Sequence, residues 1–163
     1  YQALEKGIID AAEWVGPYDD EKLGFNKVAK YYYTPGWWEG NAPSLYLVNT
    51  KAWDSLPKEY QNAFTAAAAE SNVLATAKYD QLNPQAMRRL IASGVQLRTF
   101  SRELLDACYK ASMDQYAEWS DQNADFKRLY ESYSKFLEEQ ISWFRVAEST
   151  FDNYMSYVKQ KRK

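Results

Sequence analysis

The chain has 163 residues, of which 26% are charged and 46% hydrophobic, a composition typical of one folded domain rather than of a disordered segment. The net charge of −2 provides no basic surface for nucleic acid, so no nucleic-acid partner is expected. The chain contains no histidine and one cysteine, Cys108. These counts exclude Ser-His-Asp and Cys-His catalysis, zinc sites with histidine ligands and disulfides within the chain.

The first 56 residues predict short elements, because five of the six glycines lie among the first 40 residues. A helix is expected to end at Gly7, and the apolar stretch 8–15 is typical of a buried strand. A short helix should begin after Pro17. The alternating stretch 44–49 predicts a half-buried strand, followed by a helical turn over 51–56.

The remainder predicts long helices. Pro57 suits the first turn of a helix that continues to Gly94, with a kink or restart at Pro84. Residues 95–100 predict a short strand, and Ser101 suits the cap of the next helix. Cys108 lies on an apolar stripe of that helix, so we expect an unreactive thiol in the core.

The last segment carries apolar side chains at helical spacing over about 37 residues. One largely apolar stripe comprises Phe126, Leu129, Tyr133, Leu137, Gln140, Phe144, Ala147, Phe151, Met155 and Val158; a second comprises Trp143, Val146, Thr150, Tyr154 and Tyr157. A straight helix of this length would extend roughly 55 Å, which exceeds the width of a compact domain of this size. The helix is therefore expected to bend, or to lie partly on another domain or subunit.

Two glutamates stand beside tryptophans in the first 40 residues. Glu13 and Trp14 end the predicted strand, and Glu39 follows Trp38 after a Pro-Gly turn. Ligands gather at the carboxyl ends of strands in α/β folds, and two carboxylates with a main-chain carbonyl suit Na⁺ or Ca²⁺. The same acids could act as the acid and nucleophile of a glycosidase with the tryptophans as a sugar platform, or could be solvated loop residues.

Other polar groups have simpler structural explanations. Asp19 and Asp20 suit the positive N-terminus of a helix, although they could also bind a metal ion. The three tyrosines 31–33 favour packing over recognition. Possible anion-binding residues are Arg88, Arg89 and Arg98, which more commonly are exposed arginines.

The stretch GIIDAAEWVGPYDDEKLGFNKVAKYYYTPGWWEG, residues 7–40, resembles the C-terminal half of the solute-binding proteins of tripartite ATP-independent periplasmic (TRAP) transporters, the DctP family. It is most similar to the branch that binds 2-oxo acids and monocarboxylates such as pyruvate or lactate. The resemblance continues through VNTKAWDSLPKEYQ and AKYDQLNPQAMRRLIASGVQLRTFSRELLDACYKA to the aromatic terminal helix. It therefore covers essentially the whole chain.

The resemblance implies an α/β fold, periplasmic-binding-protein-like and two-lobed, of which this chain is the helix-rich C-terminal portion with a long terminal helix. Residues 1–56 would end one lobe and carry the ligand and cation segment. Residues 57–123 would contribute a long connecting helix and part of the second lobe. Residues 124–163 would form the terminal helix, which some relatives exchange between the subunits of a dimer.

The resemblance also implies a metal ion that bridges the protein and the ligand carboxylate. Carried over by position, Glu13 and Glu39 would donate side-chain oxygens, and Trp14 its main-chain carbonyl. Many relatives have glutamine where Glu39 stands, and a second carboxylate favours Ca²⁺ over Na⁺. The apolar wall of the pocket would comprise Trp14, Pro17, Tyr18 and Trp38.

By this resemblance the protein is not an enzyme but a periplasmic subunit that delivers a small organic acid to TRAP membrane permease subunits. Members of the family are about twice as long as this chain. The signal peptide and the arginine that pairs with the ligand carboxylate are therefore expected in a missing first half. Two other classes remain open on the residues alone. They are a carbohydrate-active enzyme that uses Glu13 and Glu39, and a helical interaction scaffold that uses the aromatic stripes.

Overall fold

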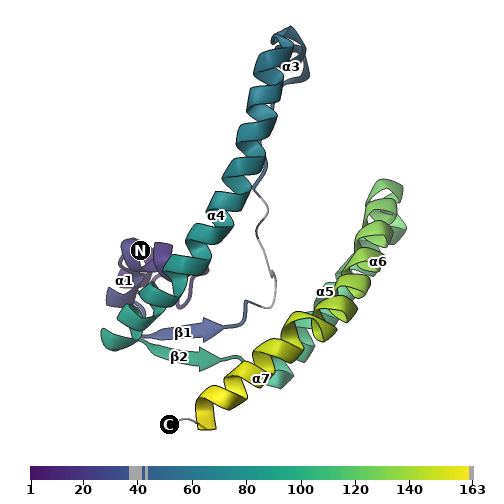
Figure 1. The fold of residues 1–163 in the computed structure, drawn as a ribbon. Coiled ribbons are helices and arrows are strands. Elements are labelled where there is room, and N and C mark those ends of the chain that lie inside the picture. The colour runs from purple at the N-terminus through teal and green to yellow at the C-terminus, as the bar shows by residue number, and fades with distance from the viewer. Residues whose placement is uncertain (37–41, 43, 162–163) are drawn as a thin grey trace. The chain divides into compact units, whose positions relative to one another are not determined.

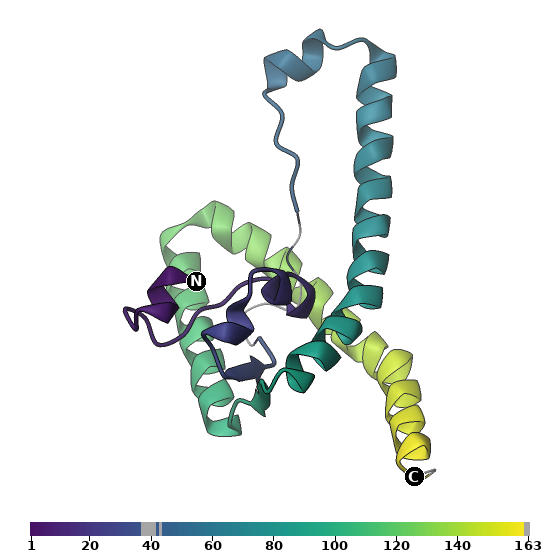
Figure 2. The same cartoon turned by 90° about the vertical axis from the view of Figure 1, so that its left-hand side faces the viewer.

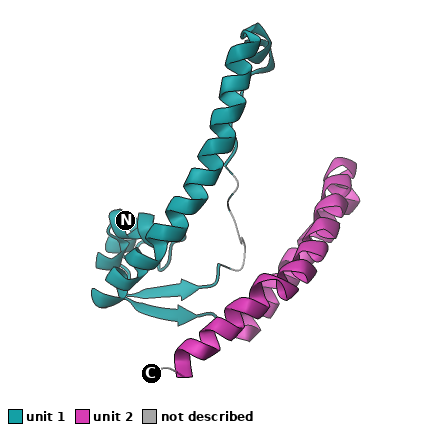
Figure 3. Cartoon of the chain, in the orientation of Figure 1, with its two compact units in different colours: residues 1–101 teal, residues 102–163 magenta. Residues whose placement is uncertain are grey.

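The structure is a computed structural model that describes residues 1–36, 42 and 44–161. Figure 1 shows its ribbon, and Figure 2 shows the same ribbon turned by 90°. The chain forms two compact units, Tyr1–Ser101 and Arg102–Lys163 (Figure 3). Helices dominate both units, and no described helix is long and apolar enough to cross a membrane.

The first unit begins with short elements, as the glycine-rich sequence predicts. Helix α1, Gln2–Glu5, is followed by Gly7 at a positive φ of 66°, which confirms the predicted helix end. Helix α2, Pro17–Lys22, has its proline in the first turn. A 3₁₀ turn, η1 (Phe25–Lys27), then leads into strand β1, Tyr31–Thr34.

The strands predicted over 8–15 and 44–49 are not formed, and both predictions are wrong. Each stretch is irregular, and in the second Leu45 and Leu47 are 77% and 90% exposed. A strand exists only where a neighbouring strand pairs with its N–H and C=O groups. Among the described residues the only pair of strands is β1 with β2 (Gln96–Thr99), so both stretches lack a partner.

Helices α3 and α4 are close neighbours in the sequence. Helix α3, Thr50–Ser55, is capped by Asn49, whose side chain accepts from the amides of Lys51 and Ala52. Helix α4 spans Lys58–Ala92 and continues through Pro84, so the helix does not restart there. Figure 2 shows that α4 bends in its C-terminal half, the half that contains this proline.

The core of the first unit lies where the end of α4 meets the sheet. Strands β1 and β2 are parallel, in register from Tyr31 opposite Gln96 to Thr34 opposite Thr99 (Figure 1). The turn between α4 and β2 is a Schellman motif: the Gly94 amide donates to Ile91 at 3.0 Å, and the Val95 amide donates to Leu90 at 3.2 Å. The buried apolar residues at this junction are Ala86, Leu90 and Val95.

The second unit consists of helices α5 (Arg102–Gln122), α6 (Ala124–Val146) and α7 (Glu148–Lys161). Asn123 ends α5 and caps α6 by accepting from the Phe126 amide at 3.0 Å. Aromatic rings join the two helices, with Tyr116 and Tyr130 centred 5.0 Å apart. The long terminal helix is divided at Ala147, in line with the expectation that it does not run straight.

Candidate functional site

The first predicted site segment is accessible to a ligand. Residues 11–15 are irregular and exposed, and the Trp14 side chain is 54% exposed. Within the described part of the chain, no hydrogen bond or ion pair engages the Glu13 carboxylate. Glu13 and the carbonyl of Trp14 are therefore available to an external partner.

This segment leads directly into α2, which is fixed to α4 at three points. The Tyr18 amide donates to Oδ1 of Asn83 at 3.1 Å, next to Gly16. The Tyr79 hydroxyl donates to Oδ2 of Asp19 at 2.7 Å. These contacts join two helices. The exposed segment is therefore connected to a helix, α2, that is held against α4.

The third point is a bidentate ion pair. Arg89 donates to both carboxylate oxygens of Glu21, at 2.7 and 2.6 Å. The guanidinium lowers the pKa of Glu21, and Glu21 raises the pKa of Arg89 in return. The Arg89 guanidinium is engaged in this pair, so Arg89 has a structural role. Of the two interpretations of Arg89, an ordinary exposed arginine agrees with this better than an anion-binding residue does.

Tyr18, at the start of α2, contacts both an aromatic ring and a cationic side chain. Its ring meets Tyr79 edge-on at 6.2 Å, and Nζ of Lys22 lies 3.8 Å from the ring centroid. Interaction with Lys22 is the main cause that lowers the pKa of the Tyr18 phenol. Pro17 and Tyr18 are both partly exposed, so each retains surface that a small ligand can contact.

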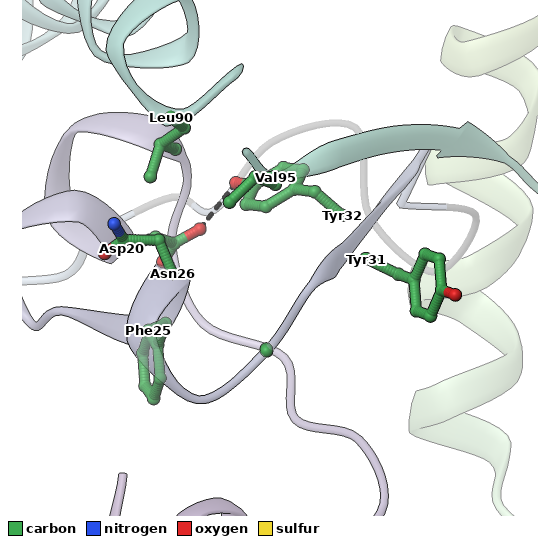
Figure 4. A pocket seen from close by; sticks show the side chains of 8 residues that line it. Asp20, Phe25, Asn26, Tyr31, Tyr32, Leu90 and Val95 are labelled. Carbon is green, nitrogen blue, oxygen red and sulfur yellow. Dashed lines mark hydrogen bonds between the residues drawn. The ribbon is translucent and has the colours of Figure 1, made fainter. Parts of the chain in front are cut away.

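The sequence did not reveal that Asp20 is buried. It is only 7% exposed, and the Tyr32 hydroxyl donates to its Oδ2 at 2.5 Å (Figure 4). Burial is the main cause that raises the pKa of Asp20, and it likewise raises that of Tyr32. The three successive tyrosines were the sequence feature that could have indicated this contact. Such aromatic runs favour strands, and alternate side chains of a strand point inward.

The tyrosine run is explained by packing, as the sequence favours. Tyr32 faces the interior, whereas Tyr31 and Tyr33 are about half exposed. Tyr33 stacks on Phe100, with ring centroids 5.0 Å apart. The free thiol of Cys108 is half-buried on α5 in the second unit.

The oxygen donors that the structure describes fit a hard cation in part. Glu13 offers a carboxylate and Trp14 a neighbouring main-chain carbonyl, both oxygen ligands of the kind that Ca²⁺ and Na⁺ accept. Trp38 and Glu39 lie outside the described residues. Among the described residues, no group of three or more His, Cys, Asp or Glu side chains could enclose a metal ion. A cation here would therefore need further oxygen ligands.

Comparison with known proteins relates these features to one family. Residues 1–123 match the DctP family, described as bacterial extracellular solute-binding protein, family 7. The chain is 47% identical over 156 residues to a monocarboxylate 2-oxoacid-binding periplasmic protein of Nostoc sp. strain PCC 7120, covering 96% of this chain and 43% of that protein. The chain spans less than half the length of this relative.

A crystal structure is also similar. A TRAP transporter solute binding protein from Bordetella bronchiseptica RB50 matches with a TM-score of 0.92 and 52% identity, over 100% of this chain and 48% of that one. That protein is described as a mixed occupancy dimer, with copurified calcium and picolinate in one active site and the other site apo. The predicted fold class and family resemblance are confirmed by these matches.

Proposed function

Because the chain belongs to family 7 of the bacterial extracellular solute-binding proteins, we propose that it is the C-terminal portion of a two-lobed solute-binding subunit of a TRAP transporter. The family comprises periplasmic solute-binding proteins and not enzymes, which removes the support for a glycosidase that uses Glu13 and Glu39. In this proposal residues 1–56 end one lobe and carry the ligand segment. Residues 57–123 contribute to the second lobe, and residues 124–163 form the terminal helical element.

The proposed ligand is a small organic acid of the 2-oxo acid or monocarboxylate class. The name of the Nostoc relative supports this class, and picolinate in the Bordetella protein is likewise a small carboxylate beside a hetero atom. The subunit would act in the periplasm and deliver the acid to TRAP membrane permease subunits. Trp14, Pro17, Tyr18 and Trp38 would form the apolar side of the pocket.

We further propose a bridging cation held by Glu13, the carbonyl of Trp14 and Glu39. The observation that carries this proposal is the exposed Glu13–Trp14 segment, whose oxygen atoms are free within the described chain and whose base is fixed to α4. Calcium is favoured over sodium, because two carboxylates suit a divalent ion and because the Bordetella protein copurified with calcium. The cation would compensate the negative charge of the ligand and orient its carboxylate.

The test uses the protein at the length of its relatives, called here the two-lobed protein. Glu13→Gln removes one charged ligand, and Glu5→Gln on α1 is the matched control with another exposed glutamate. Bound calcium and sodium are measured by elemental analysis, and unfolding temperature is followed with pyruvate, lactate or picolinate, with and without chelator. Saturation at about 100 times Kd should stabilise the unmodified protein by about 2.7 kcal/mol.

We expect Glu13→Gln to lose the metal and most of the acid-dependent stabilisation, while Glu5→Gln keeps both. Stabilisation that returns with calcium but not with sodium would identify the divalent ion. If Glu13→Gln binds metal and acid as tightly as its control, the proposed cation site is wrong. An unmodified protein that is stabilised by none of the acids would contradict the ligand class.

A further inference from the structure

The stretch 44–48, which leads to α3, is attached to α4 along one side. Figures 1 and 2 show this part of the chain as an extended trace beside the N-terminal half of α4. The hydroxyl oxygens of Tyr46 and Ser71 lie 3.1 Å apart, and the Tyr46 ring meets Phe64 edge-on at 5.8 Å. Tyr46 therefore holds the stretch against the helix.

The other side of the stretch is bare. Leu45 and Leu47 are 77% and 90% exposed, whereas Tyr46 and Val48 are 58% and 40% exposed. This alternation is the two-residue period of a strand, in which successive side chains point to opposite sides. No backbone N–H or C=O group of residues 44–48 is hydrogen-bonded to any residue that the structure describes. The stretch thus presents an apolar side together with a free backbone edge.

The sequence of this stretch does not oppose strand pairing. Residues 44–50 contain neither a charged side chain nor a proline, the residues with which proteins commonly block an exposed strand edge. Four consecutive large apolar residues of this kind would promote aggregation if they stayed exposed. We therefore expect another part of the folded protein to cover them.

The length of the relatives indicates what that part is. This chain spans 43% of the Nostoc protein and 48% of the Bordetella protein, so more than half of each relative has no counterpart in it. In a protein of that length, the additional part is covalently continuous with residues 44–48. It therefore has an effective concentration at this edge that a second copy lacks.

We propose that residues 44–48 are a strand of the two-lobed protein, paired along its backbone edge with a strand from the part of that protein outside this chain. This inference rests on the proposed function. The partner strand would place large aliphatic side chains beside Leu45 and Leu47 on the same face of the sheet and would carry few charges. With α4 on the Tyr46 side and an apolar layer on the other, the strand would be buried on both faces.

The first experiment follows amide hydrogen exchange by NMR in the unmodified two-lobed protein without ligand. Amides of residues 45–48 that point to the partner should exchange at least about 100-fold more slowly than in an unstructured peptide, with the amides of β2 as reference. One paired edge would protect alternate amides, and two paired edges would protect all four. Exchange within about tenfold of the unstructured rate at all four amides would overturn the proposal.

Dilution distinguishes the proposed partner from a second copy of the protein. Exchange is repeated with detection by mass spectrometry, at a concentration where light scattering gives the mass of a monomer. Protection that persists in the monomer supports pairing within one polypeptide. Protection that is present only at concentrations where the protein is dimeric would assign the edge to a second copy, and the proposal would be wrong.

A substitution tests the bare side independently of the backbone. Leu47→Ala in the two-lobed protein should lower the unfolding temperature by about 5 °C, because it removes a large side chain from a buried site. Lys51→Ala, at an exposed position on α3, is the control and should shift it by less than about 1 °C. An equally small shift for Leu47→Ala would mean that Leu47 stays exposed, which contradicts the proposal.

Picolinate binding, measured by calorimetry with saturating calcium on the same unmodified protein, separates this inference from the proposed function. Binding without protection of residues 45–48 would overturn the strand pairing alone. Protection without binding of picolinate or of any other organic acid would support the pairing and contradict the proposed ligand class.

Discussion

At the scale of single residues, Asp20 combines burial with a titratable group. Its surroundings contribute Tyr32 from β1, Asp19 beside it on α2, and the backbones of Val15 and Gly16. Burial is the largest influence and raises its pKa, so the folded state holds the proton more tightly than the unfolded state does. The charge on Asp20 is therefore unfavourable for folding.

We predict that Asp20→Asn changes how stability depends on pH. Below the ordinary aspartate pKa of 3.8, the carboxyl is neutral in both states, so burial imposes no charge penalty on the folded state. As pH rises from there through the raised folded value, the unfolded state releases its proton more readily, and this part of the stability is lost. Asparagine does not ionise, so the variant should gain stability relative to the unmodified protein between acidic and neutral pH.

The measurement is urea unfolding of both proteins in acidic and neutral buffers, compared as a difference at each pH. Asp19→Asn is a control at the neighbouring, less buried carboxylate, which accepts from Tyr79. A difference between Asp20→Asn and the unmodified protein that is the same in both buffers would contradict the assignment of Asp20 as the buried titrating group.

At the scale of elements, the turn between α4 and β2 depends on Gly94. Its φ of 99° is a backbone conformation that L-residues rarely adopt, although no atom lies within 4 Å of an added Cβ. Gly94→Ala should therefore lower the free energy of unfolding by about 1 kcal/mol through backbone strain alone. Chemical denaturation of the two-lobed protein would measure this loss.

Gly16→Ala is the matched control for this prediction. Gly16 has an extended backbone with a φ of 161°, and an added Cβ would meet Oδ1 of Asn83 at an ordinary 3.6 Å. We expect this variant to change stability by less than about 0.5 kcal/mol. Equal losses at both positions would indicate that the turn at Gly94 is not maintained by its conformation.

The elements that the sequence predicts well are those whose signals are local. Pro57, helix-forming residues and Gly94 mark α4, and each acts on its own stretch of chain. The stretch 95–100 also pairs as predicted, because β1 is available within the first unit. The stretches 8–15 and 44–49 have similar apolar patterns but no partner among the described residues, so their pattern alone does not produce a strand.

In the candidate site, too, some features could be predicted from local sequence and others depended on tertiary packing. Glu13 and Trp14 are identified by the family resemblance, and their exposure in the structure is compatible with the predicted role, which remains a prediction. The contact between Asp20 and Tyr32 was not predicted, because a helix-start aspartate usually faces water and its sequence neighbours do not indicate burial. Such a contact depends on how α2 and β1 pack, which is information that local patterns do not contain.

At the scale of the whole molecule, the second unit exposes many aromatic and aliphatic side chains on its last two helices. The side chains that are at least 40% exposed on α6 and α7 are Leu129, Tyr133, Phe136, Leu137, Ile141, Trp143, Phe144, Val146, Phe151, Tyr154 and Tyr157. Exposed apolar side chains in such number mark an interface. We propose that a second copy of the protein covers it, as the resemblance implies and as the dimeric Bordetella relative supports.

This proposal predicts that the dimer is lost when Phe144, Phe151 and Tyr154 are changed together to alanine. These side chains are 42%, 63% and 62% exposed, so their removal should leave the folded subunit largely intact while weakening the contact between subunits. Light scattering at several concentrations should give the mass of a monomer for this variant and of a dimer for the unmodified two-lobed protein. Exposed polar residues of the same two helices, Lys135, Asp152 and Lys159, provide a control triple alanine variant that should remain dimeric. Because hydrophobic contact and not general helix loss would drive the change, both variants should keep the same helical circular dichroism. A dimer that survives the aromatic replacements would show that these side chains do not form the interface.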